Sequence, residues 1–314
     1  MSVNSFAIAL ANAALWTVYL QLTRQIVGGG RLDSWAYTLV QLLAAGVLMM
    51  WLGRRAPGSW RDLISPWTML YALARVVVVG STAASLVWLA AAQSTLVATS
   101  SVVVGALAAW AIERRPPPRR ERWAIAGLFV GIVGLVANLT PDTAWRGAMW
   151  TILSESVLVA TSFMIAAHPS NRSPDLAVRS RFTGEMLLVT SVALIAGWTV
   201  AGLAGVTRTP WEGAGDAFGN PELWMWGVLA GLVFRGPGTW ISFWTINAAG
   251  VQGYLIGLTA IPFLSILAEI ALGELGLINA ARLSLAEWLA AAAILAAALW
   301  LMVVRLQARD AGAP

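Results

Sequence analysis

The sequence predicts an all-α polytopic membrane protein with ten transmembrane helices, and three observations lead to that fold class. Of the 314 residues, 59% are hydrophobic and only 11% are charged, whereas a soluble domain carries about 25% charged residues. The mean hydropathy of the chain is +0.73. The apolar residues also gather in stretches of the roughly 20 residues that a helix needs to cross a bilayer. The function is therefore expected to lie in what the helices enclose.

The predicted spans fill almost the whole chain and are joined by short connections. They cover residues 5–27, 33–53, 67–92, 95–112, 122–140, 146–167, 181–204, 223–247, 251–272 and 284–305. The first stretch lacks the basic start and the cleavage site of a signal peptide, so we interpret it as a span. Gln93-Ser94 alone separates the third span from the fourth. Connections this short predict a compact bundle of antiparallel neighbours.

The distribution of arginine predicts how the chain is oriented. All 20 basic residues are arginine. Three of them fall inside predicted spans, four lie in loops on one side of the membrane, and the rest lie in loops on the side of the N-terminus. Because cytoplasmic loops are enriched in basic residues, both termini are predicted to be cytoplasmic. The abundance of arginine and alanine indicates a bacterial protein, which would lie in the lipid bilayer of the inner (plasma) membrane.

Composition also excludes several classes of function. The chain has no cysteine and one histidine, His168, so it cannot form a disulfide, a thiolate metal site or a histidine cluster. No nucleotide-binding loop is present, and the Ser94 and Ser100 hydroxyls have no histidine base nearby in the sequence. We therefore expect no metal, no cofactor and no enzymatic activity. The net charge of +5 comes from arginines in loops that set the orientation of the chain in the membrane. Nucleic acid is therefore not expected as a partner.

The chain repeats itself at half length. In each half a helix rich in small residues ends at a glutamate, Glu113 or Glu274, and a loop and a tryptophan follow. The halves, residues 1–142 and 143–314, hold five predicted spans each and form one membrane domain. Because five is odd, the second copy must be inverted in the membrane relative to the first. Inverted repeats of this kind place a substrate site at the repeat interface near the midplane.

These residues resemble the drug/metabolite transporter superfamily, in its EamA-like branch, over nearly the whole chain. The run LTAIPFLSILAEIALGE at 258–274 matches the family's pattern of a proline, an apolar helix and L-G-E. In the first half Ser101 stands where proline is usual, and Ile112-Glu113-Arg114 replaces L-G-E-R. The resemblance implies alternating-access transport, often export, of a small metabolite such as an amino acid.

Charged residues inside predicted spans are the first candidates for a substrate site, since a charge costs a few kcal/mol in the membrane and usually faces the bundle interior. Arg75 and Arg235 occupy nearly equivalent places in the two halves, and Glu155 lies near the middle of the sixth span. In one interpretation an arginine binds a carboxylate or phosphate, while Glu155 binds an ammonium group or a proton. In the other, an arginine pairs with Glu155 or Glu185 and only locks helices together.

Two prolines and two helix-end glutamates are expected to have gating or structural roles. Pro237 and two glycines surround Arg235 in the run 234–238, and proline kinks a helix. Broken helices mark binding sites in transporters, although a kink can also only shape the bundle. Pro262 raises the same question in the ninth span. Glu113 and Glu274 lie at helix ends near opposite faces of the membrane.

Polar and aromatic residues on the same spans complete the expected substrate site. Asn12, Trp16, Tyr19 and Thr23 are spaced at i, i+4, i+7 and i+11, which is one face of a helix. The other expected substrate-binding residues are Trp88, Trp240, Trp244 and Tyr254. A central tryptophan can stack on an aromatic ring or hold a quaternary ammonium group by cation–π contact. Simple packing in the bundle is the alternative for each of them.

These residues are compatible with three alternative functions. The first is a secondary active or facilitative transporter of a small polar or zwitterionic metabolite. The second is a transporter of an organic cation such as choline or a guanidino compound, and the third is a non-transporting membrane subunit for lipid handling or assembly. The sequence is compatible with proton coupling through Glu155 and with exchange without an ion, and with a monomer and a homodimer.

The arginine-rich run 113–122 either sets the topology or binds lipid headgroups.

Overall fold

The protein is a bundle of helices. The computed structural model describes residues 3–58, 63–114, 116–139, 144–167, 170, 173–204, 217–245, 258–278 and 283–310, and these contain no β-strand. Five helices in these ranges are long and apolar enough to cross a membrane: Ser34–Leu52, Pro66–Trp88, Ala91–Ala111, Leu176–Leu203 and Leu285–Val304. The architecture is therefore consistent with an all-α membrane protein.

Most helices lie where the apolar stretches predict them, with ends that shift by a few residues. The ninth predicted span is the exception, because it begins at 251 whereas α13 begins at Ile261, and residues 251–257 lie outside the described ranges. Their bounds are α1 Val3–Val27, α2 Ser34–Leu52, α4 Pro66–Trp88, α5 Ala91–Ala98, α6 Ser100–Glu113, α7 Arg119–Ala137, α8 Ala144–Ala167, α10 Leu176–Leu203, α11 Pro221–Ala230, α13 Ile261–Glu274 and α14 Leu285–Asp310. Two short 3-10 turns, η1 Gly28–Gly30 and η2 Ala217–Gly219, precede α2 and α11. A π-turn, η3 Gly231–Arg235, follows α11 and leads into helical residues 236–245.

The predicted connection at Gln93-Ser94 is wrong, because the chain turns earlier. The structure places the turn at Leu89-Ala90, and both Gln93 and Ser94 lie inside α5. The Gln93 side-chain oxygen accepts a hydrogen bond from the Ala90 N–H at 3.1 Å, so this residue caps the start of the helix that it was expected to precede. Thr99 then separates α5 from α6, and the expected fourth span is made of these two helices.

Glycines allow the closest contacts between helices. A methyl group on Gly46 of α2 would lie 2.9 Å from the backbone nitrogen of Leu188 in α10. A methyl group on Gly131 of α7 would lie 2.7 Å from the Ile294 side chain of α14. Only glycine lets the two backbones of each pair approach to this distance, as small residues do in membrane helix interfaces.

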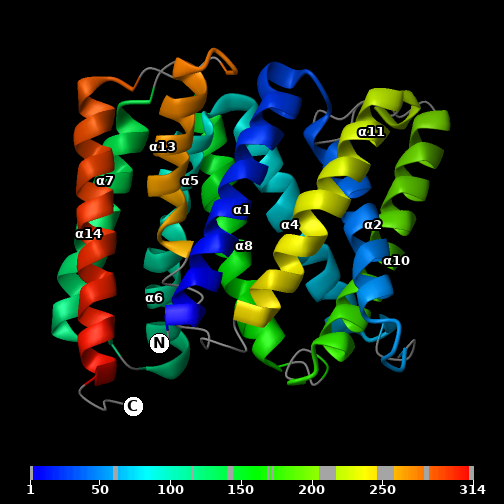
Figure 1. Ribbon diagram of the computed structural model, residues 1–314, viewed down its shortest axis with the longest axis horizontal. Coiled ribbons are helices and arrows are strands. Elements are labelled where there is room, and N and C mark those ends of the chain that lie inside the picture. Colours follow the sequence, from blue (N-terminus) through cyan, green and yellow to red (C-terminus); the bar gives the residue numbers. More distant parts are fainter. Residues whose placement is uncertain are drawn as a thin grey trace.

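The elements form one continuous bundle (Figure 1). In this view α7 and α14 lie together on the left, α2, α10 and α11 lie on the right, and α1, α5 and α13 run between them. The first residues of α1 and the last residues of α14 lie at the same end of the bundle. The outward surface carries many large apolar side chains, among them Trp123, Val130 and Leu299, which are 59–80% exposed. Soluble monomers rarely expose apolar side chains on this scale.

Candidate functional site

Arg235 lies on the break in the helix that follows η2. The break is the π-turn Gly231–Arg235, in which the N–H of Gly236 donates to the carbonyl of Gly231, five residues earlier. Pro237 follows directly and has no N–H to continue the α-helical pattern. The widened turn thus takes the place of the regular hydrogen bonds that the proline would interrupt. Single π-turns inside helices are frequent at functional sites.

Two aromatic rings of α1 hold the Arg235 guanidinium. Its central carbon lies 5.0 Å from the centre of the Trp16 ring and 5.9 Å from that of Tyr19. The rings of Trp16 and Tyr19 meet edge to face, with centroids 5.4 Å apart. Arg235 is only 8% exposed. A cation over an aromatic face in a site shielded from water gains about 2 kcal/mol, so the rings fix where this buried charge sits.

A polar network on α1 and α2 surrounds the same place. The Tyr19 hydroxyl donates to the side-chain oxygen of Gln41 at 2.7 Å. The Gln41 side-chain nitrogen is buried and has no hydrogen-bond partner among the described residues. Tyr37 and Thr23 share a hydrogen bond of 3.5 Å between their hydroxyls. A buried amide donor without a partner is costly, and it supplies a hydrogen bond that a bound ligand can accept.

Glycines bring the broken helix close enough for these contacts. A methyl group on Gly231 would lie 2.5 Å from the carbonyl oxygen of Gln41, and one on Gly238 would lie 3.1 Å from the Trp16 ring. Asn12 of α1 and Ser242 also form a hydrogen bond, at 3.3 Å from amide nitrogen to hydroxyl oxygen. The face of α1 that was predicted from its spacing therefore meets the helix that carries Arg235. We call Trp16, Tyr19, Gln41 and Arg235 the Arg235 site.

Glu155 lies in another neighbourhood. Its carboxylate is within hydrogen-bonding reach of Ser101, the second residue of α6. Its neighbour Ser154 donates to the carbonyl of Val78 in α4 at 2.8 Å. The contacts of Glu155 thus lead to α6 at the Thr99 break, whereas the contacts of Arg235 lead to α1. Glu185, the other acidic candidate for pairing with an arginine, forms an ion pair with Arg181 on its own helix.

Arg75 and the other three candidate tryptophans, Trp88, Trp240 and Trp244, contact residues outside the Arg235 site. Arg75 and Arg179 both interact electrostatically with the hydroxyl group of Tyr71. The guanidinium carbon of Arg146 lies 5.4 Å from the Trp88 ring centre, where α4 ends and α8 begins. Trp240 and Trp244 contact each other with ring centroids 6.0 Å apart, and Trp244 is 43% exposed.

The remaining candidates lie at helix ends or outside the described residues. Pro262 is buried in the first turn of α13, and Glu274 is exposed at the end of that helix. Glu113 ends α6, but its side chain is outside the described part of the structure, as is the whole of Tyr254. No group of three or more acidic or histidine side chains that could hold a metal ion occurs among the described residues.

A second cluster of charges surrounds Leu89-Ala90, with Glu269 and Glu287 buried and Arg24 half-buried, and sequence analysis did not predict its roles. Arg24 of α1 donates to the carbonyls of Leu86 and Val87 at 2.6 and 3.1 Å, at the end of α4. Glu269 of α13 accepts from the N–H of Ala92 at 3.0 Å, at the start of α5. Each charge therefore satisfies backbone groups that a helix end leaves without partners. The signs also match the helix dipole, with the cation at a C-terminus and the anion at an N-terminus.

Glu287 completes this cluster, which we call the α4–α5 joint: Arg24, Gln93, Glu269 and Glu287 around Leu89-Ala90. Glu287 is fully buried. One of its oxygens accepts from the Gln93 amide at 2.7 Å, and the other accepts from the Ser284 N–H at 2.7 Å. The Ser284 hydroxyl accepts in turn from the Glu287 N–H at 3.2 Å. This reciprocal pair is a capping box, whose S-x-x-E pattern is visible in the sequence at 284–287.

Comparison with known proteins establishes the fold alone. No family model matches the chain, and a search of curated proteins finds no match. A solved structure described only as "Crystal structure of protein" superposes with a TM-score of 0.55, over 97% of this chain and 99% of that one. The two sequences are 17% identical. The whole chain thus shares its fold with a solved structure that carries no functional description.

Proposed function

We propose that the protein is a secondary active or facilitative transporter that moves a small zwitterionic metabolite, such as an amino acid, by alternating access. The observation that carries this proposal is Arg235, a buried cation on a broken helix, held by aromatic rings in the interior of the bundle. In many transporters, discontinuous helices supply the groups that bind the substrate. An intramembrane charge in such a place is a functional site by default.

The packing supports an inverted five-plus-five repeat, as in the drug/metabolite transporter superfamily that the sequence resembles. The helices α6 and α13 are both 14 residues long and end at Glu113 and Glu274. Their second residues are Ser101 and Pro262, the two positions that correspond in the sequence repeat. The second helix of each half packs against its counterpart, α2 on α10, and the fifth helices do the same, α7 on α14. A two-fold axis in the membrane plane between the halves would produce these self-pairings.

The chemistry of the Arg235 site favours a carboxylate on the substrate. A guanidinium offers five N–H donors in a planar fork that matches a carboxylate. The Trp16 and Tyr19 rings already hold the cation of Arg235, which argues against their use as a cage for an organic cation. The Gln41 amide adds a neutral donor beside them. Glu155, whose contacts lie on other helices, is the group that we assign to a coupling proton.

The same proposal places the chain in the bacterial inner membrane with both termini in the cytoplasm. Two observations support the orientation. The first residues of α1 and the last of α14 lie at one end of the bundle (Figure 1). The Trp300 indole of α14 donates to the carbonyl of Arg120 at 3.4 Å, which puts the arginine-rich run at that same end. Clustered arginines beside both termini are what the positive-inside rule requires of a cytoplasmic face.

Counterflow in proteoliposomes tests the function. Proteoliposomes that contain the purified protein are loaded with an unlabelled solute, and the same solute in labelled form is added outside. The solutes tested are amino acids, choline and guanidinium compounds. We expect uptake of amino acids, and a loss of about a hundredfold in Arg235→Ala, since a bidentate charge-assisted pair is worth about 3 kcal/mol. Arg235→Lys should not restore it, because an ammonium group lacks the planar fork.

Arg146→Ala is the matched control, because it also removes an arginine that lies over a tryptophan ring, but at the end of α4. It should leave counterflow unchanged. Uptake of cations alone would transfer the function to the organic-cation class. Full amino-acid counterflow in Arg235→Ala would reject the site. A wild type that exchanges none of these solutes would reject the proposed substrate class and leave a substrate outside the panel or a non-transporting subunit.

A further inference from the structure

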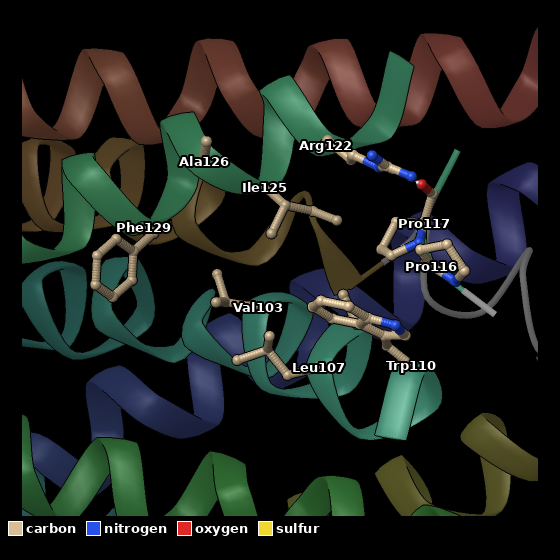
Figure 2. A pocket seen from close by; sticks show the side chains of 10 residues that line it. Val103, Leu107, Trp110, Pro116, Pro117, Arg122, Ile125, Ala126 and Phe129 are labelled. Carbon is tan, nitrogen blue, oxygen red and sulfur yellow. Dashed lines mark hydrogen bonds between the residues drawn. The ribbon is translucent and has the colours of Figure 1, made fainter. Parts of the chain in front are cut away.

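We infer that a groove between α6 and α7 binds one acyl chain of an anionic phospholipid, whose headgroup lies against arginines at the end of the groove. This inference goes beyond transport and rests only on the placement of the chain in a membrane. The groove has a volume of about 390 Å³. Its walls are formed by Val103, Leu107 and Trp110 of α6 and by Ile125, Ala126 and Phe129 of α7 (Figure 2). We call it the α6–α7 groove.

The dimensions of the groove suit the upper part of an acyl chain. Val103, Leu107 and Trp110 are spaced at i, i+4 and i+7, which is one face of a helix. Arg122 and Phe129 are seven residues apart on α7. Seven residues at 1.5 Å of rise each give a length of about 10 Å. Half of the hydrocarbon core is about 15 Å thick, so a chain in the groove would lie within one leaflet, parallel to the helices.

The walls are apolar and open to the surroundings. Leu107, Trp110 and Phe129 are 52–56% exposed. Among the described residues that line the groove, Arg122 is the one that is charged. Leaving an apolar surface of this kind uncovered in water is unfavourable. Lipid tails cover it without requiring any polar partner, which is why we assign an acyl chain rather than a polar solute.

The charge at one end of the groove specifies an anionic headgroup. Pro116 and Pro117 close that end, and the Arg122 Nε donates to the carbonyl of Pro117 at 2.8 Å (Figure 2). Because this bond uses Nε, the two terminal nitrogens of Arg122 remain as donors for a phosphate. Arg119 and Arg120 are exposed in the same turn. Clusters of arginine beside a membrane attract anionic lipids.

Trp110 lies at the same end, as Figure 2 shows. Tryptophan is enriched at the level of lipid headgroups, where its ring is covered by tails and its N–H meets polar groups. The fixed φ of the prolines keeps the loop in place against it. The groove therefore matches the order of groups along a phospholipid. Its apolar walls lie beside the tail, Trp110 lies at the boundary between tail and headgroup, and the arginines lie beside the phosphate.

Native mass spectrometry of the purified full chain in detergent tests the inference. Dioleoyl phosphatidylglycerol and dioleoyl phosphatidylcholine have the same tails and differ in net headgroup charge. We expect preferential retention of phosphatidylglycerol. The triple variant Arg119→Gln, Arg120→Gln and Arg122→Gln should weaken its binding at least about tenfold and leave phosphatidylcholine unchanged. Ala106→Trp, which fills the groove, should weaken both lipids.

Two control variants separate the groove from general effects. Arg54→Gln with Arg55→Gln removes two exposed arginines from the end of α2, and Val133→Trp enlarges an exposed side chain of α7 outside the groove. Neither should alter lipid binding. Equal retention of phosphatidylglycerol by the wild type and Ala106→Trp would overturn the inference, and so would a dimer that only Ala106→Trp dissociates, because a second copy would then cover the groove. Counterflow reports on transport separately, so either proposal can fail alone.

Discussion

Two of the regions in which charged side chains lie inside this bundle use those charges differently. At the α4–α5 joint, Arg24 and Glu269 contact backbone groups at the ends of two helices, and Glu287 contacts a backbone N–H and an amide. In the Arg235 site, the guanidinium lies in the middle of a broken helix against two aromatic rings. Both regions lie inside the bundle, but only at the α4–α5 joint do the charged side chains contact the ends of helices.

The difference shows that burial of a charge does not by itself identify a binding site. Charges at the joint satisfy the unpaired carbonyls and N–H groups that every helix end leaves, which explains their presence without any ligand. No helix end explains Arg235. Aromatic rings stabilise a cation through its charge, so Trp16 and Tyr19 account for the position of Arg235 without a helix end. Variants at the two regions should therefore separate stability from transport.

The largest effect on stability is expected at Glu287. Glu287→Ala leaves the buried Gln93 amide and the Ser284 N–H without their acceptor. Hydrogen bonds to a charged group are worth about 1.5–3 kcal/mol each, so the free energy of unfolding should fall by about 3 kcal/mol. Chemical denaturation in detergent micelles measures it. Glu274→Ala makes the same change at an exposed helix end and should cost less than about 0.5 kcal/mol. Equal losses in the two variants would contradict a special role for the joint.

A smaller effect should couple Arg24 and Glu269. The two side chains attract each other electrostatically, and they cap the two helices that meet at Leu89-Ala90. A double-mutant cycle of Arg24→Met and Glu269→Gln should give a coupling of about 1–2 kcal/mol in the free energy of unfolding. The comparison cycle pairs Arg24→Met with Glu222→Gln, since Glu222 forms its ion pair with Arg31 instead. A coupling near zero in the first cycle would show that each charge acts alone.

The sequence predicted the helices well because apolar stretches of spanning length have few alternatives. It failed at the turn between α4 and α5, where Gln93 and Ser94 look like a polar connection but lie inside a helix. The reason is that Gln93 bonds to its own helix start and to Glu287, 194 residues away. A pattern within a single stretch cannot show a partner at that distance. The Ser284 capping box is local and was readable, but its link to α5 was not.

The Arg235 site was also predictable in part. The spacing of Asn12, Trp16 and Tyr19 placed them on one face of α1, and the glycines and proline around Arg235 predicted the broken helix. The part played by Gln41 could not be predicted, because it depends on the close approach of Gly231 to α2. The grouping of Glu155 with Arg235 had no basis beyond depth in the membrane. In the structure Glu155 and Arg235 contact different helices. The depth of a residue in the membrane does not show which helix it contacts.

The smallest effect should come from Tyr19→Phe, which tests how the site is held rather than what it binds. The variant keeps the ring beside Arg235 and removes only the hydrogen bond to Gln41. One such bond contributes about 1 kcal/mol, so counterflow should slow by about fivefold as Gln41 loses its anchor. Tyr71→Phe removes a buried tyrosine hydroxyl near Arg75 and Arg179 and should leave counterflow intact. If both variants slow counterflow equally, Tyr19 contributes only to the fold, and the assignment of Gln41 to the substrate site fails with it.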